Sequence, residues 1–174
     1  MQKLILKSVL IIGFLATVLL SCTTTSKEKQ HAKSKHNTSA HELLTPFGCV
    51  NPFVGTGGHG WGVGSSFPGA KTPFGMVAPS PDTTFYGFHF PFYHCSGYYY
   101  GDVQIRGFSQ THLHGTGAGD YGAILIMPIN GFDNSKIFEQ GYRSRFSHHL
   151  EYAEPGYYSV LLLDPDIFVE ITAT

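Results

Sequence analysis

The 174-residue chain carries 11 Lys and Arg against 12 Asp and Glu, a net charge of −1 at pH 7 that argues against a nucleic-acid-binding protein. Charged residues make up only 13% of the chain, whereas Gly contributes 21 residues, Phe 14, Tyr 10 and Pro 10. Aromatic residues suit a pleated sheet and Gly and Pro punctuate short strands. This composition excludes a protein of long helices and predicts an all-β fold, a β-sandwich.

Residues 1–21 have the pattern of a bacterial lipoprotein signal peptide. Lys3 and Lys7 precede an apolar run over residues 8–20, which is too short to span a bilayer. The run ends in LLSC, a pattern that a lipoprotein signal peptidase accepts before a lipid-bearing cysteine. We therefore expect lipidation of Cys22 and a lipid-anchored membrane protein of the cell envelope, on its periplasmic or surface face. A plain signal peptide, or a short anchor helix with a chance cysteine, is the alternative.

Residues 22–45 are expected to form a disordered tether. The segment TTTSKEKQHAKSKHNTS has almost no large apolar side chain, so it cannot bury enough surface to order itself. No aromatic residue lies between its lysines, which favours a solvated tether over an arm that binds nucleic acid. The remaining residues, 46–174, suffice for one domain with a core of its own.

Short apolar runs in this domain predict the strands. Residues 74–78 and 98–104 are two candidates, and residues 123–128 are a third. The third run, AILIM followed by Pro, is apolar on both faces and is therefore predicted to be a buried strand.

A hairpin is predicted at the end of the chain. Its strands are residues 157–163 and 167–173, and the intervening Asp-Pro-Asp supplies the turn. One face of the second strand is lined by Ile167, Val169, Ile171 and Ala173. The alternation is still running at Thr174, so we expect the domain to be incomplete at its C-terminus and the chain to be a piece of a longer protein.

A first glycine-rich stretch, VNPFVGTGGHGW, spans residues 50–61. No strand leads into it and no helix follows, and Pro68 and Pro73 would break such a helix, so it is not interpreted as a phosphate-binding loop. The glycines instead permit a tight loop that displays the rings of Phe53, His59 and Trp61. Such rings suit the C–H faces of a sugar. The alternative is that these glycines merely serve turns.

A second glycine-rich region begins at CSGYYY and continues through GFSQTHLHGTGAGDYG. His112 and His114 would face the same side of a strand and could bind a metal together. A third ligand is not evident, since His94, Asp102 or Asp120 could serve only if the fold brought them close. The favoured interpretation is that one histidine bonds a ligand or a loop carbonyl and the other is structural. We therefore assign no metal site.

These regions resemble glycoside hydrolase family 92, the calcium-dependent exo-acting α-mannosidases. The resemblance is carried by VNPFVGTGGHG, FPGAKTPFGMVAPSPDT, CSGYYYGDVQIRGFSQTHLHGTGAGDYGAILIMP and SVLLLDPDIFVEITAT, which cover most of residues 50–174 in the family's order. It implies an N-terminal β-sandwich domain packed against a larger helical-barrel catalytic domain, which this chain lacks, with the active site between them. It also implies hydrolysis of mannose-containing glycans with inversion, by a carboxylic acid and a carboxylate base, with calcium helping to distort the sugar.

In this family the acid, the base and the calcium ligands look to belong to the helical domain. We therefore assign no catalytic or metal-ligating residue in this chain, and expect it to be inactive alone. The acidic residues of the domain are interpreted as turn, cap and ion-pair residues, and include Asp82, Asp102, Asp120, Asp133 and Glu151. A non-catalytic carbohydrate-binding lipoprotein and a purely structural sandwich are the alternative functions.

Motif matching implies which loops contribute to the substrate cleft. The expected substrate-binding residues are Gly55, Thr56, Gly57, His59, Tyr93, His94, Cys95, His112 and Gly115. The chain departs from the family at Phe92-Tyr93-His94, where an acidic residue and a tryptophan are frequent, and this puts the linkage preference in doubt. His114 replaces a small hydroxyl residue and would narrow a pocket there. Cys49 and Cys95 could pair in an exported protein, but a place for Cys95 at the sugar site favours a free thiol.

Overall fold

The computed structural model describes residues 45–59, 64–73, 75–84, 93–117 and 122–173. Several predicted features lie outside the described residues, namely the signal peptide, Cys22, nearly all of the tether, Trp61, Phe92 and Asp120. Within the described part, no helix has the length and apolar character needed to cross a membrane.

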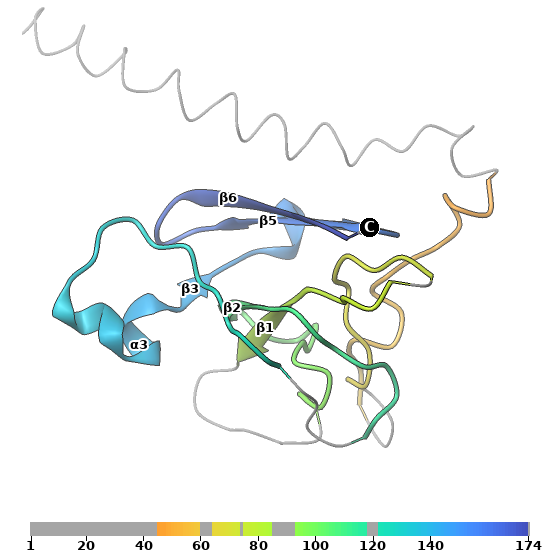
Figure 1. Ribbon diagram of the computed structural model, residues 1–174, viewed down its shortest axis with the longest axis horizontal. Coiled ribbons are helices and arrows are strands. Elements are labelled where there is room, and N and C mark those ends of the chain that lie inside the picture. The colour runs from red at the N-terminus through yellow and green to blue at the C-terminus, as the bar shows by residue number, and fades with distance from the viewer. Residues whose placement is uncertain (1–44, 60–63, 74, 85–92, 118–121, 174) are drawn as a thin grey trace, which may run out of the picture.

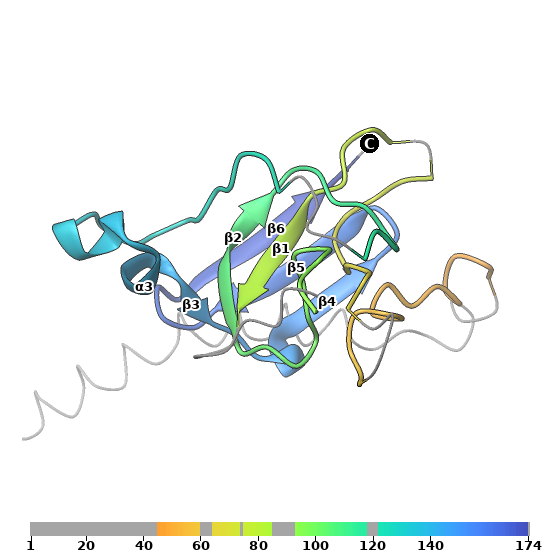
Figure 2. The same ribbon diagram turned by 90° about the horizontal axis from the view of Figure 1, so that it is seen from below.

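Two three-stranded antiparallel sheets lie one over the other (Figures 1 and 2). The first sheet has the order β1-β2-β3, formed by Ser80–Thr84, Gln104–Ser109 and Ser144–Arg145. The second has the order β4-β5-β6, formed by Glu151–Glu154, Tyr157–Leu162 and Ile167–Thr172. This arrangement confirms the predicted all-β fold.

Helical structure in the described residues is limited to single turns. The 3₁₀ turns η2 and η3 span Asn134–Ile137 and His148–Leu150, and the helix α3 spans Glu139–Tyr142. Asp133 caps η2, because its Oδ1 accepts a hydrogen bond from the Ser135 backbone N–H at 2.8 Å, as expected of a cap residue. The segment that carries η2 and α3 projects beyond the edge of the two sheets (Figure 1).

The core lies between the two sheets. Tyr158, Val160 and Leu162 alternate along β5 and so face the same side, where they meet Ile105 and Phe108 of β2. Four further core residues come from outside these two strands: Phe67, Ala78, Tyr98 and Phe146. Burying one such large side chain contributes about 1.5–3 kcal/mol, so the contact between β2 and β5 is a main source of stability.

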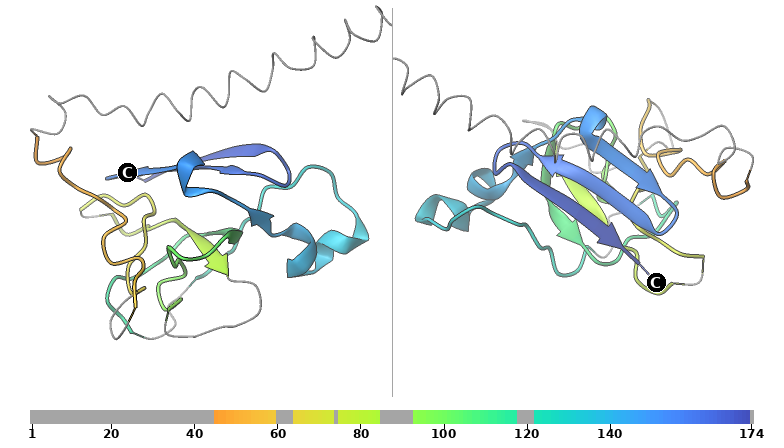
Figure 3. Two further views of the ribbon diagram at one scale, coloured as in Figure 1. Left: turned by 180° about the vertical axis from the view of Figure 1, so that it is seen from behind. Right: turned by 90° about the horizontal axis from the view of Figure 1, so that it is seen from above.

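The predicted terminal hairpin is confirmed. β5 and β6 pair antiparallel from Tyr157 opposite Thr172 to Leu162 opposite Ile167 (Figure 3). Asp166 in the turn has a φ of 53°, a conformation that Asp tolerates better than most residues. The Arg145 guanidinium donates to Asp164 at 2.7 Å, which joins the turn to β3 of the other sheet.

Two other predicted strands are displaced along the chain. Residues 75–78 are irregular, and β1 begins after them. Residues 98–103 are also irregular, and only residue 104 of that prediction lies in a strand, at the start of β2. The reason is a turn in the Tyr-rich segment, closed by the Asp102 N–H, which donates to the Tyr99 carbonyl at 3.0 Å.

The prediction of a buried strand at residues 123–128 is wrong. Ile124, Leu125 and Ile126 are 68%, 38% and 56% exposed. The run makes one isolated bridge, between Phe108 and Ile126, and one further backbone hydrogen bond, from the Gln110 N–H to the Ala123 carbonyl at 3.4 Å. Ile124 has a φ of 57°, and a left-handed conformation costs a residue other than Gly about 1–2 kcal/mol and interrupts a ladder. Apolar composition alone therefore did not distinguish a surface segment from a core strand.

Candidate functional site

Four segments lie beside the first sheet, and we call them the loop cluster: residues 53–59, 64–66, 93–100 and 112–115 (lower right of Figure 1). The site residues predicted from the sequence lie in three of them, and residues 64–66 are added by the structure. Backbone hydrogen bonds join them, because the Tyr100 N–H donates to the Thr56 carbonyl at 2.9 Å and the Gly115 N–H to the Ser65 carbonyl at 2.6 Å. The Ser96 hydroxyl also donates to the Leu113 carbonyl at 2.8 Å. The structure thus brings together segments up to about sixty positions apart in sequence.

The first glycine loop packs closely against its neighbours. Gly55 has a φ of 82°, and a Cβ at Gly57 would lie 2.7 Å from the Tyr100 Cβ. Thr56 is fully buried and its hydroxyl donates to the Phe53 carbonyl at 2.8 Å. Thr56 therefore shapes the loop from inside, whereas His59 at its end is exposed.

His94 is held by a buried carboxylate. Its Nε2 lies 2.5 Å from Asp102 Oδ2, and the His94 side chain is 14% exposed. The same Asp102 oxygen accepts from the Thr83 hydroxyl at 2.7 Å, and the Thr83 oxygen in turn accepts from the Tyr99 N–H at 2.9 Å. Asp102 thus bonds the His94 ring and fixes its orientation.

Cys95 lies inside the loop cluster. Its Sγ is 3.3 Å from Ser65 Oγ and 3.6 Å from the Gly64 carbonyl oxygen, and the residue is fully buried. Cys49 is exposed, and it forms no disulfide with Cys95, as the sequence favoured. Burial places the Cys95 thiol behind the cluster surface, where it supports the loops.

His112 is buried and lies close to Gly97 and Asp82. Its Nε2 lies 2.8 Å from Ser109 Oγ, and Ser109 donates to Asp82 Oδ2 at 2.6 Å. Ser, His and Asp in contact suggest a nucleophile, but Ser109 and His112 are each only 1% exposed, so the group is structural. A bulge between Asp82 and Thr83 accounts for this placement, because it lets both neighbouring side chains reach loop partners.

His114 points to a different neighbour. Its ring stacks on Phe67 with a centroid distance of 4.1 Å, and partial burial, together with Lys71 and His112, lowers the pKa of His114. The two histidines of the Thr-His-Leu-His segment therefore do not form a shared metal site. Gly115, which follows, has a φ of 74° and open space where a Cβ would stand.

Sequence reasoning missed one buried network beside the loop cluster. The Glu151 side chain is fully buried at the start of β4 and accepts from the Tyr98 hydroxyl at 3.0 Å and the Tyr158 hydroxyl at 2.6 Å. His148 Nδ1 donates to the same carboxylate at 2.6 Å. Burial, followed by the Glu151 charge, raises the pKa of both tyrosines, so they remain donors.

Comparison with a family sequence model and with solved structures identifies the family of this chain. The sequence model of the "Glycosyl hydrolase family 92 N-terminal domain" matches residues 49–174. The chain belongs to this family. A solved family GH92 α-mannosidase, BT3965 from Bacteroides thetaiotaomicron, is 43% identical, with a TM-score of 0.61 over 72% of this chain and 16% of that protein. The GH92 glycosyl hydrolase ccman5 is 36% identical, with a TM-score of 0.55 over 66% of this chain and 14% of that protein. Among curated proteins, none matches.

The GH92 N-terminal domain therefore spans about a sixth of the length of the α-mannosidase that it resembles. The same α-mannosidase has also been solved with mannoimidazole, and that structure matches this chain with 42% identity and a TM-score of 0.60. Recognition of the family and of its all-β N-terminal fold from the sequence is thus confirmed.

Calcium does not fit the residues that the structure describes. Calcium takes about 6–8 oxygen ligands, and the described segments contain no group of three His, Cys, Asp or Glu side chains that could hold a metal. The buried carboxylates of Asp102 and Glu151 are already bonded to histidines, and Asp82 is bonded to Ser109. No step of the chemistry is therefore derived through calcium in this chain.

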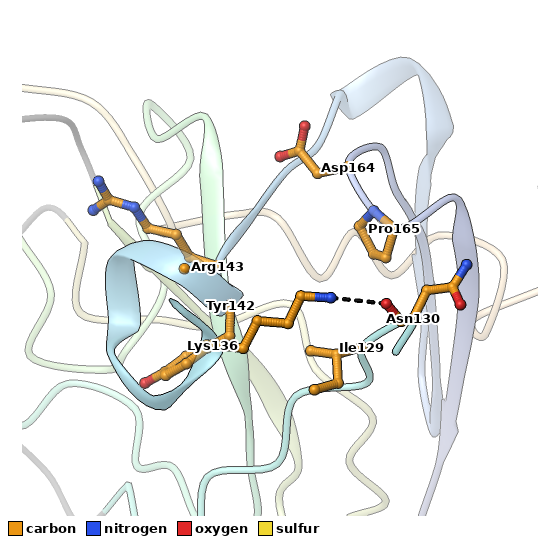
Figure 4. A pocket seen from close by; sticks show the side chains of 8 residues that line it. Ile129, Asn130, Lys136, Tyr142, Arg143, Asp164 and Pro165 are labelled. Carbon is orange, nitrogen blue, oxygen red and sulfur yellow. Dashed lines mark hydrogen bonds between the residues drawn. The ribbon is translucent and has the colours of Figure 1, made fainter. Parts of the chain in front are cut away.

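Of two cavities, one lies away from the loop cluster and the other borders it. The smaller, of about 260 Å³, lies between Tyr142 and Pro165, away from the cluster (Figure 4). Lys136 reaches across it and donates to the Asn130 carbonyl at 2.7 Å, so its ammonium group is engaged. The larger, of about 490 Å³, borders the cluster and is lined by Phe67, Lys71 and His114 among others.

Proposed function

We propose that this chain is the N-terminal domain of an inverting α-mannosidase that acts on mannose-containing glycans, and that its loop cluster forms one wall of the substrate cleft. The observation that carries the proposal is the family match over residues 49–174, because this region contains all the loops of the cluster. The α-mannosidase BT3965, 43% identical over the shared region, supports the substrate class.

The cluster can bind and orient a sugar but is not equipped to cleave it. An inverting pair needs two carboxyl groups about 6.5–9.5 Å apart, one on each side of the bond being cut. Asp102 and Glu151 are almost fully buried, and each is bonded to a histidine. We therefore assign the acid, the base and the calcium ligands to a helical catalytic domain outside this chain, and propose that the chain alone is inactive.

The loop cluster contains aromatic rings that can pack on a sugar and an oriented imidazole that can form hydrogen bonds with its hydroxyls. Tyr93 and Tyr99 stack at 5.0 Å, and His94 lies beside them with its ring held by Asp102. Aromatic faces pack on the C–H side of a pyranose, and oriented imidazole and backbone groups bond its hydroxyls. We propose that this part of the wall contacts the sugar at the leaving side of the bond.

A lipid on Cys22 would hold the domain at a membrane of the cell envelope. The LLSC pattern after the apolar run at residues 8–20 supports this proposal. Labelled fatty acid should enter the protein in its source and should be absent from Cys22→Ala; equal labelling of both would contradict the anchor.

Activity tests the proposed function. We expect the 174-residue chain, with added Ca²⁺, to leave 4-nitrophenyl α-D-mannopyranoside intact. Protein isolated from its source with an antibody against residues 45–174 should hydrolyse that substrate and release β-mannose first, as inversion requires. Hydrolysis by the chain alone would contradict the assignment of the catalytic groups, and initial release of α-mannose would contradict inversion.

A further inference from the structure

His148 lies between two groups that can only accept hydrogen bonds. Its Nδ1 is 2.6 Å from Glu151 Oε2, and its Nε2 is 2.8 Å from the Tyr100 carbonyl oxygen. A neutral imidazole has one N–H, whereas a protonated imidazole has two. With Glu151 ionised, both contacts are satisfied together only when His148 carries its proton.

The groups around His148 favour this charged form. Partial burial acts to lower the pKa of His148, but the hydrogen bond from its ring to Glu151, the Glu151 charge and the Tyr100 carbonyl outweigh it and raise this pKa above its ordinary value. The Glu151 carboxylate also accepts from the neutral phenols of Tyr98 and Tyr158. The Tyr100 ring stacks on the imidazole at 3.9 Å, and the Phe146 ring meets it edge-on at 5.2 Å.

Tyr100 links His148 to the first glycine loop. Its carbonyl accepts from His148, and its N–H donates to the Thr56 carbonyl at 2.9 Å. Gly57 packs so closely on Tyr100 that a Cβ at Gly57 would stand 2.7 Å from the Tyr100 Cβ. A shift of Tyr100 would therefore move Thr56 and Gly57 with it.

We propose that His148 is a positioning residue, which holds Thr56 and Gly57 in the cleft-lining geometry when protonated and releases them when it loses its proton. The link to sugar binding rests on the proposed function, whereas the response of the loop to pH does not. The raised pKa of His148 determines how its contribution to stability depends on pH. This contribution is fully present below the ordinary pKa of His. It is lost as pH rises through the raised pKa in the folded protein.

Proton–nitrogen correlation spectra of the chain, recorded from about pH 5.5 to about pH 9, test this role around the ordinary His pKa of about 6.5. We expect the amides of Thr56, Gly57 and Tyr100 to shift with the midpoint of the His148 ring, which should lie above the ordinary His value. His149 is the neighbouring histidine and is exposed. His148→Gln should abolish this common titration, and the matched control His149→Gln should preserve it. Because the titration of the unsubstituted protein needs no variant, failure of His148→Gln to fold leaves the test intact.

Loop amides that stay fixed while His148 titrates would overturn the proposal, as would an unchanged titration in His148→Gln. In a second arm, methyl α-D-mannopyranoside should bind about three- to tenfold more weakly above the His148 midpoint than below it, the effect expected of one hydrogen bond. Equal affinity on both sides would contradict the link to binding. A loop that titrates with His148 in a chain that binds no mannoside at any pH would support the positioning role and contradict the proposed function.

Discussion

Replacing Glu151 by Ala is expected to lower the free energy of unfolding by about 3–5 kcal/mol, the usual effect of removing one partner of a buried charged network. The fully buried carboxylate accepts hydrogen bonds from Tyr98, Tyr158 and His148. In Glu151→Ala all three donors would remain without this acceptor, and the two tyrosines are themselves fully buried. Urea unfolding followed by tyrosine fluorescence measures the loss.

Glu170→Ala is the matched control. Glu170 also lies on a strand of the second sheet and accepts from a tyrosine, Tyr157, but it is exposed. Its replacement should change the free energy of unfolding by less than about 1 kcal/mol. Similar losses in the two variants would show that the Glu151 network does not hold the second sheet to the loop cluster.

Replacing Gly97 by Ala is expected to destabilise the domain by about 3 kcal/mol. Gly97 has a φ of 77°, and a Cβ there would lie 2.5 Å from Asp82 Oδ1 and 2.6 Å from His112 Cε1. Both neighbours are held by Ser109, so neither can move without breaking a hydrogen bond. Overpacking of this kind typically costs about 1–3 kcal/mol, and the left-handed conformation adds about 1 kcal/mol.

Gly131→Ala separates these two costs. Gly131 has a φ of 70° and no atom within 4 Å of an added Cβ, so only the conformational cost of about 1 kcal/mol should appear. Thermal unfolding of the two variants gives the difference. Equal losses would mean that the contact between Gly97 and His112 is looser than the structure has it.

The terminal hairpin and the family could be predicted because their signals are local. Alternation over residues 157–173 and a Pro-containing turn specify β5 and β6, and the glycine motifs identify the family directly. The prediction of a buried strand at residues 123–128 failed because its composition does not show the local backbone conformation. Ile124 is left-handed and the run makes a single bridge, so the run stays on the surface. The gathering of the loop cluster could be expected only through the family resemblance.

The network at Glu151 could not be predicted because its partners are distant in sequence. Tyr98 precedes Glu151 by 53 positions, and the Tyr100 carbonyl that His148 contacts is 48 positions away. One local signal was present in the sequence. His148 lies three positions before Glu151, which is the first residue of β4. That spacing fixes the His148–Glu151 pair, but only the packed fold shows that it faces the loop cluster.

A titration of the isotope-labelled chain with methyl α-D-mannopyranoside, followed in proton–nitrogen correlation spectra, tests most directly the claim that the loop cluster is one wall of a mannoside cleft. We expect shifts concentrated at residues 55–59, 93–95 and 112–115, and none in the β5–β6 hairpin turn at residues 163–166. Methyl α-D-galactopyranoside should cause smaller shifts at equal concentration. Shifts spread evenly over the domain, or none at the cluster below the His148 midpoint, would contradict the account.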